Sequence, residues 1–232
     1  MPILFALLLL AFIPLTNART IGIFNGAGTC EGCGETVGAF FEARNDKVIY
    51  LNEKTLNAAT LSKIEVYVQP GGSDDIDETL NALVPAQIKA LRQFVNRGGS
   101  YLGICAGAYL AARISVMGSG KPAYALIDAG EVESEITSSE PTLLPVLWQG
   151  KKLWLYSQSG PHLGTTAPPG ATVLGRYKRS GRIAGLITNY GKGKVMLIGP
   201  HLEAGSDWYQ ADGLSLQYGT AEAEFALLLD KL

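Results

Sequence analysis

A cysteine stands between two glycines in the segment Gly103-Ile104-Cys105-Ala106-Gly107, with a strand-like run over 101–104 before it and a helix-like run over 106–113 after it. This order is typical of a tight strand-to-helix turn that presents a nucleophile at the end of a parallel strand. Glycine on both sides lets neighbouring backbone pass close to the turn. The start of a helix beside the sulfur favours its thiolate form. The segment therefore predicts an α/β fold in which Cys105 is a nucleophile.

The first half of the chain alternates between short apolar runs and helix-like runs. Strands are expected over 20–24, 47–51, 64–69 and 101–104, and helices over 37–44 and 85–97. In the second helix Ile88, Leu91, Phe94 and Val95 have amphipathic spacing, and Gly98-Gly99 ends it. Strands that alternate with helices predict a mostly parallel central sheet with crossover helices.

The second half is rich in short strands. Runs over 131–137, 146–148, 151–156, 172–177, 182–188 and 194–198 are joined by tight glycine turns such as Gln149-Gly150, and a helix is expected over 220–229. These spacings predict antiparallel hairpins. Glu131, Glu133 and Glu135 alternate along one run, and we interpret them as a solvated strand face rather than a metal cluster.

Residues 1–18 carry no charged side chain, and their apolar run is too short to span a bilayer as a mature helix. Thr16 and Ala18 suit a cut after Ala18, so the stretch predicts a signal peptide, followed by one domain over 19–232 and a periplasmic or secreted location. Because no Lys or Arg precedes the apolar run, an uncleaved anchor or a first strand is the alternative. The net charge of -2 predicts neither a nucleic-acid partner nor a membrane partner after cleavage.

Three cysteines are present, so at least one is unpaired, and Cys105 is the obvious candidate. Cys30 and Cys33 form a C-x-x-C segment, which is compatible with a local disulfide, a redox pair or half of a zinc site. No second pair of sulfur or nitrogen ligands stands nearby, so we expect no metal and no cofactor.

A cysteine nucleophile needs a base, and the chain has two histidines, His162 and His201. Each histidine lies in a Gly-Pro-His-Leu sequence that follows a strand-like run, but only His201 is followed two residues later by an acid, Glu203. In extended backbone these two side chains face the same side, so Glu203 can orient the imidazole. The three residues Cys105, His201 and Glu203 fit the roles of nucleophile, base and orienter.

An amide substrate also needs donors for its developing oxyanion. The backbone N–H of Ala106, at the helix start, is one candidate. Gly71 and Gly72, in the turn after the strand over 64–69, offer a second, although they also suit a plain turn.

Three segments together resemble the class I glutamine amidotransferase-like superfamily: Val68-Gln69-Pro70-Gly71-Gly72, the run from Gly98 to Tyr109, and Gly199-Pro200-His201-Leu202-Glu203. The sequence is most similar to the biotin-protein ligase N-terminal domain family, which shares the elbow around Cys105 and a first loop like Asn25-Gly26-Ala27-Gly28-Thr29. The resemblance implies a flavodoxin-like α/β sandwich, with Cys105 as nucleophile, His201 as base and Glu203 as its partner. Leu202 stands where amidotransferases usually have proline.

From these observations we expect an exported cysteine hydrolase, an amidase or peptidase-like enzyme that acts on a small-molecule or peptide amide through a thioester at Cys105. The family name does not imply biotin ligation, because no ligase catalytic domain fits in this length. The alternative is a catalytically silent module of the same fold that binds a ligand or a partner protein. A third, weaker hypothesis assigns redox work to Cys30 and Cys33.

Overall fold

The computed structural model describes residues 18–73, 75–114, 120–128 and 132–232. All but the last residue of the predicted signal peptide lie outside these ranges. Within them, one nine-stranded sheet has the strand order β2-β1-β3-β4-β11-β10-β9-β6-β7. No helix in the described ranges is both long and apolar enough to cross a bilayer.

One side of the sheet is parallel. Its strands are β1 (Thr20–Phe24), β2 (Lys47–Leu51), β3 (Val66–Gln69), β4 (Ser100–Ile104) and β11 (Gly193–Ile198). β3, β4 and β11 are buried along almost their whole length, as strands covered on both faces must be. The predicted parallel sheet is confirmed, and its carboxyl edge is where β4 delivers Cys105.

The other side of the sheet is antiparallel. Its strands are β6 (Thr142–Trp148), β7 (Lys151–Ser157), β9 (Thr172–Tyr177) and β10 (Ile183–Tyr190), and a separate small sheet pairs β5 (Glu133–Ser134) with β8 (Pro161–His162). Gln149 and Gly150 turn the β6–β7 hairpin, both with positive φ, as the expected two-residue turn requires. The strand expected over 131–137 is shorter, because only two of its residues pair with β8.

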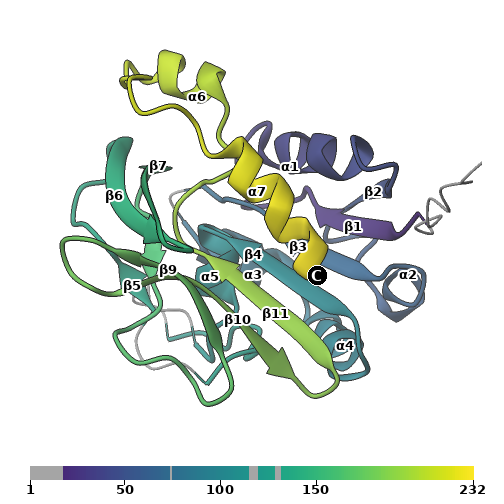
Figure 1. The fold of residues 1–232 in the computed structure, drawn as a ribbon. Coiled ribbons are helices and arrows are strands. Elements are labelled where there is room, and N and C mark those ends of the chain that lie inside the picture. Colours follow the sequence, from purple (N-terminus) through teal and green to yellow (C-terminus); the bar gives the residue numbers. More distant parts are fainter. Residues whose placement is uncertain (1–17, 74, 115–119, 129–131) are drawn as a thin grey trace, which may run out of the picture.

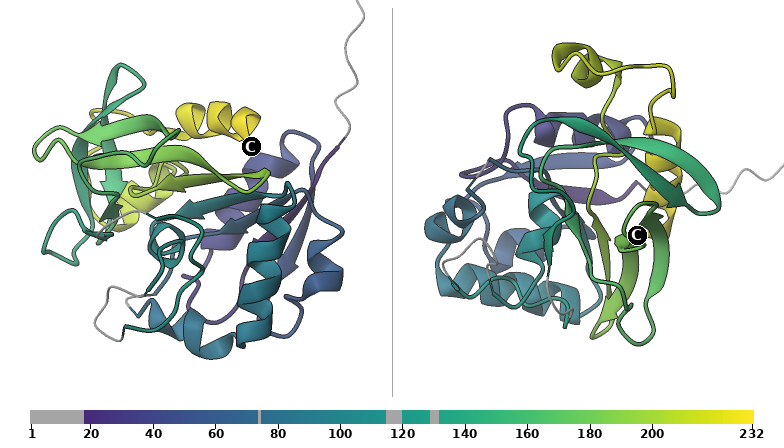
Figure 2. Two further views of the ribbon diagram at one scale, coloured as in Figure 1. Left: turned by 90° about the horizontal axis from the view of Figure 1, so that it is seen from below. Right: turned by 90° about the vertical axis from the view of Figure 1, so that its left-hand side faces the viewer.

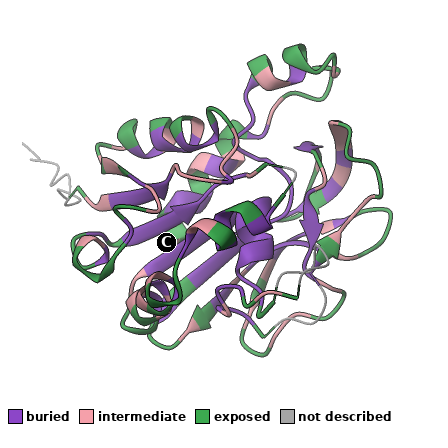
Figure 3. Cartoon of the chain, turned by 180° about the vertical axis from the view of Figure 1, so that it is seen from behind, coloured by how far each residue is buried: buried purple, intermediate pink, exposed green. Residues whose placement is uncertain are grey.

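Helices cover both faces of the parallel strands (Figures 1 and 2). The helices of the described residues are α1 (Cys33–Glu42), α2 (Ala58–Leu61), α3 (Asp77–Ala82), α4 (Pro85–Asn96), α5 (Ala106–Leu110), α6 (Ser206–Ala211), α7 (Glu222–Leu228) and the 3-10 turn η1 (Leu229–Lys231), of which α6 lies away from the parallel strands (Figure 1). Side chains of α1 and α7 share one core cluster, and those of α4 and α5 share the other. Buried positions therefore line the sheet on both sides, as Figure 3 shows. This is the flavodoxin-like sandwich that the sequence predicts.

The helix after Cys105 is shorter than its sequence indicates. It was expected to run to residue 113 but ends at Leu110. The returning segment supplies the reason: Tyr124 N–H donates to Leu110 O, and Leu126 N–H donates to Ala111 O, both at 2.9 Å. These donors satisfy carbonyls that would otherwise extend the helix.

Helix α1 starts earlier than expected, at Cys33 rather than residue 37. Gly32 precedes it with a φ of 74°, a left-handed conformation that glycine adopts without strain. Gly34, in the first turn, leaves no room for a side chain, because a Cβ there would lie 2.9 Å from Asn25 Oδ1. The helix can therefore begin directly after the loop and against β1.

Candidate active site

Cys105 lies at the point where β4 ends and α5 begins. Its φ of 49° and ψ of −107° are unusual for a residue with a side chain, and its amide donates to Ile198 O at 2.8 Å. The turn is tight: a Cβ on Gly103 would lie 2.5 Å from Gly107 O, and one on Gly107 would overlap Gln69 O. The two glycines thus have the packing reason that their spacing predicts. The strained backbone at the sulfur-bearing residue is a feature typical of functional sites.

His201 and Glu203 come from the loop that follows β11. The strand does not continue through them; instead His201 N–H donates to Tyr156 O of β7 at 2.8 Å in an isolated bridge. The imidazole Nδ1 lies 2.7 Å from Glu203 Oε1, and both side chains are at least 95% buried. Leu202, between them, packs into the core with no exposed surface. The structure therefore brings together the pair that the sequence proposed, despite the missing proline.

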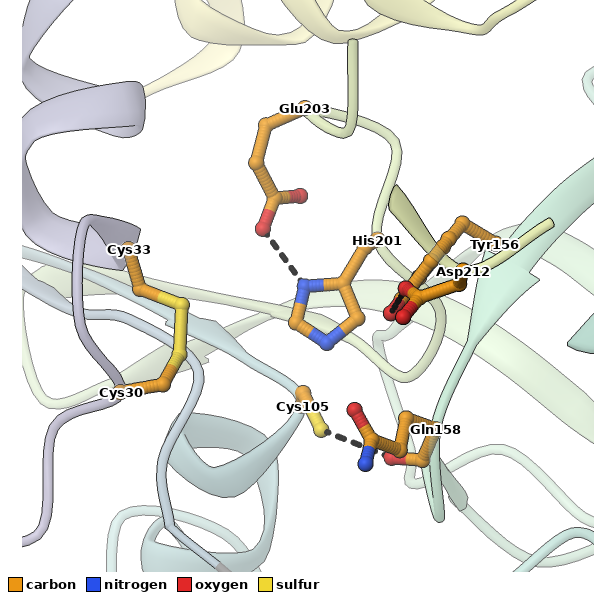
Figure 4. Close-up of a disulfide and its surroundings, with 8 residues drawn as sticks. All are labelled: Cys30, Cys33, Cys105, Tyr156, Gln158, His201, Glu203 and Asp212. Carbon is orange, nitrogen blue, oxygen red and sulfur yellow. Dashed lines mark hydrogen bonds and ion pairs between the residues drawn. A yellow bond between two sulfur atoms is a disulfide. The ribbon is translucent and has the colours of Figure 1, made fainter. Parts of the chain in front are cut away.

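The imidazole of His201 faces Cys105 with its other edge, Nε2 (Figure 4). Burial lowers the pKa of His201, but the Glu203 carboxylate, the charge on Cys105 and hydrogen bonds to both outweigh it and raise the pKa to about 10. The sulfur has a further contact at 3.7 Å from Gln158 O, to which the thiol donates. Cys105, His201 and Glu203 thus form a line in which Glu203 is the most buried member.

Gly71 and Gly72 pack directly against this line. A Cβ on Gly71 would lie 2.8 Å from His201 Cε1, and one on Gly72 would lie 2.6 Å from Ala106 Cβ. Gly72 and Thr29 face each other in an isolated antiparallel β-bridge. The hydrogen bonds of this bridge are made by the flanking residues: Ser73 N–H donates to Gly28 O, and Cys30 N–H donates to Gly71 O. In such a bridge the N–H of Gly72 points away from Thr29.

Cys30 and Cys33 form a disulfide beside Gly71. Their sulfur atoms would lie 3.1 and 3.5 Å from a Cβ on Gly71, so the disulfide packs on the face of Gly71 that also meets His201. Of the alternatives for this C-x-x-C segment, the disulfide is the one present. In the described ranges, no group of three or more His, Cys, Asp or Glu side chains is placed to hold a metal ion.

A cavity of about 750 Å³ opens above the sulfur. Besides Cys105, Ala106, Gly72 and His201 it is lined by Cys30, Ser73, Ile76, Tyr109, Ser134, Ile136, Thr137, Ser139, Tyr156, Gln158, Ser159 and Trp208. Sequence analysis missed the aromatic members of this set. Tyr156 sits at the end of an ordinary alternating strand and Trp208 in a short helix after the histidine, so neither position carried a recognisable signal.

His162 lies apart from this cavity's lining. It is 4% exposed, its Nδ1 accepts from Gly164 N–H at 3.2 Å, and its Nε2 is 4.0 Å from Glu133 Oε2. The expected solvated glutamate face is only partly present: Glu133 is exposed, but the side chain of Glu135 is 6% exposed and lies 4.0 Å from Arg182. Glu135 lies just after β5, where the chain bends, so the alternation expected for a strand does not extend to it. Glu131 lies outside the described residues.

Comparison with known proteins gives one family and many solved structures. The family described as "Biotin-protein ligase, N terminal" matches residues 20–134. No curated protein sequence matches the chain. A glutamine amidotransferase crystal structure is 16% identical and aligns over 91% of this chain and 99% of its own, with a TM-score of 0.63. A glutamine amidotransferase from Thermotoga maritima is 18% identical over 92% of both chains, with a TM-score of 0.57.

The same fold also occurs inside a larger protein. An exo-β-1,4-mannosidase from an Opitutaceae bacterium is 14% identical and aligns over 93% of this chain but only 36% of its own, with a TM-score of 0.55. At these identities the structural matches establish the fold alone.

Proposed function

We propose that the chain is a cysteine amide hydrolase, because its residues 20–134 match the family described as "Biotin-protein ligase, N terminal" and its fold resembles that of solved glutamine amidotransferases. The observation that carries the proposal is the line of Cys105, His201 and Glu203 beneath an open cavity. Cys105 supplies a nucleophilic sulfur, His201 a group that exchanges protons, and Glu203 a carboxylate that orients the imidazole. The cavity leaves room for an acyl group over the sulfur.

The first half of the reaction forms a thioester. The thiolate of Cys105 attacks the amide carbonyl carbon, and the carbonyl electron pair moves onto oxygen. The N–H groups of Ala106 and Gly72 bind this oxyanion. When the oxyanion collapses, the C–N bond breaks and His201 delivers its Nε2 proton to the departing amine. The raised pKa of His201 supports this step, because the imidazole enters it protonated.

The second half releases the acid. The amine-free site admits water, and the now neutral His201 takes a proton from it as it attacks the thioester carbonyl. The C–S bond then breaks, the carboxylic acid leaves and the Cys105 thiolate is restored opposite a protonated His201. Throughout the cycle Glu203 keeps Nδ1 protonated and the ring oriented.

We further propose that the reaction takes place outside the cytosol. The uncharged, apolar first 18 residues support export. A disulfide between Cys30 and Cys33 fits an oxidising compartment, where such bonds persist. Export also separates the enzyme from ATP-dependent synthetases, so a free-standing amidase or peptidase-like activity fits better than ammonia delivery to a partner.

Two matched substitutions test the mechanism. His201→Gln and His162→Gln each replace the histidine of a Gly-Pro-His-Leu segment. Both histidines are 4% exposed, but only His201 contacts Cys105. Amine release from a panel of neutral peptide amides, with intact-mass detection of the acyl-enzyme, provides the readout. We expect Cys105→Ala and His201→Gln to abolish turnover and His162→Gln to retain it. Turnover that survives unchanged in Cys105→Ala would refute the thioester.

The alternative function is a silent binding module. It is favoured by the 8% exposure of Cys105, by its thiol contact to Gln158 O and by the recurrence of the fold as a third of a glycosidase chain. Alkylation by iodoacetamide at pH 6 separates the two functions, since an activated thiolate reacts quickly there and an inert thiol does not. Slow alkylation together with no amide turnover supports the module.

A further inference from the structure

The cavity above Cys105 has an almost uncharged lining. Apart from the reacting pair Cys105 and His201, none of its described lining residues carries a charged side chain; the rest are aliphatic, aromatic, hydroxyl, amide, glycine and disulfide groups. We propose that the site accepts an uncharged amide, embedded in a chain or blocked at both ends, and discriminates against free glutamine. This inference rests on the proposed function and names its substrate class.

Two charged side chains that stand near the cavity are already paired with lining residues. Glu203 is 1% exposed and faces His201 Nδ1, and Asp212 accepts from the hydroxyl of Tyr156 at 2.6 Å. Free glutamine brings an ammonium and a carboxylate beside its side-chain amide. Taking both out of water into a lining whose described residues offer no acidic side chain and no basic one except His201 costs free energy that a blocked amide does not lose.

An aromatic wall gives the site a positive preference as well. Trp208 packs edge-on against Tyr156, with ring centroids 5.4 Å apart, and lies 5.3 Å from the His201 ring. Trp208 is half-buried and lines the cavity, so part of its ring remains open to a ligand. A flat or apolar group next to the scissile amide would cover this surface.

The hydroxyl groups of the lining tyrosines are already bound. Tyr109 O–H donates to Ser159 O at 2.8 Å, and Tyr156 O–H donates to Asp212 Oδ2 at 2.6 Å. Their rings therefore contribute apolar surface rather than free donors. The remaining polar groups near Cys105, among them Ser134 and Gln158, suit the neutral N–H and C=O groups of a peptide.

Binding to the Cys105→Ala variant tests the inference without depending on turnover. The probes are L-glutamine and N-acetyl-L-glutamine methylamide, which share the side-chain amide and differ in charge. We expect the blocked amide to bind at least about 100-fold more tightly, the ratio that burial of unpartnered charges produces. Calorimetry or tryptophan fluorescence gives both constants.

A second pair of probes tests the wall: N-acetyl-Phe-Gln methylamide against N-acetyl-Ala-Gln methylamide. Trp208→Ala should erase a preference of about tenfold for the Phe probe. The matched control is Trp154→Ala, which removes a tryptophan that is 36% exposed, stacks on Tyr218 and does not line the cavity. Equal or tighter binding of L-glutamine, or no binding of any blocked amide at about 10 mM, overturns the inference. Tight blocked-amide binding by a protein without turnover would refute the hydrolase but leave the ligand class standing.

Discussion

Replacing Glu203 by Gln removes one negative charge from a buried site while keeping the shape of the side chain. Glu203 is 1% exposed, and its Oε1 lies 2.7 Å from His201 Nδ1. Burial lowers the pKa of His201, so without the carboxylate only the charge on Cys105 and its hydrogen bond still raise it. We therefore expect the pKa of His201 to fall from about 10 into the neutral range.

The lower pKa of His201 in Glu203→Gln changes both the protonation of the imidazole and the pH dependence of stability. With a pKa of about 10, His201 is about 99% protonated at pH 8, and after Glu203→Gln it is protonated in a minority of molecules. The folded pKa lies above the unfolded value of 6.5. The stability that this protonation contributes is thus complete below pH 6.5, declines as the pH rises and is lost above about pH 10. Its size is at most about 5 kcal/mol.

Imidazole NMR across pH 5 to 11 measures the change, since the chain has only two histidines and His162→Gln assigns the signals. Denaturant unfolding at pH 6, 8 and 10 measures its linkage to stability. The native protein should lose stability across this range, and Glu203→Gln should be weaker at pH 6 with a gap that closes toward pH 10. A native His201 that titrates near 6.5, or a gap that is constant with pH, would refute the reasoning.

Three further substitutions have expected outcomes. Gly71→Ala places a Cβ 2.8 Å from His201 Cε1, so kcat for the amide should fall about 10- to 100-fold with a smaller change in KM. Gly107→Ala drives a methyl group into Gln69 O and should lower the free energy of unfolding by about 3 kcal/mol in denaturant titrations, whereas an unchanged midpoint contradicts the tight elbow. Cys30→Ser opens the small disulfide loop and should cost about 2 kcal/mol, a loss that reduction of the native protein should reproduce.

Local patterns were enough where neighbouring residues decide the structure. The strand–glycine–cysteine–glycine–helix order predicted the elbow, because only a residue without Cβ fits where Gly103 meets Gly107 O. The turn at Gln149 and Gly150 was also predictable, since glycine adopts without strain the positive φ that a two-residue hairpin turn needs. The ends of helices were harder to predict from the sequence. Helix α5 stops at Leu110 because a segment 14 residues later supplies its donors.

Within the candidate site, the sequence by itself determined the cysteine, its glycines and the one histidine with an acid two residues away. Their chemistry depends on residue type and local spacing, which a sequence displays. Tertiary structure alone decided that the disulfide of Cys30 and Cys33 lies beside Gly71 and that β7 places Tyr156 next to His201. It also decided that Trp208 joins Tyr156 in the aromatic wall of the cavity. Those contacts join strands and loops far apart along the chain, and they form only when the core places the elements together, because no local pattern records which side chains will share a cavity.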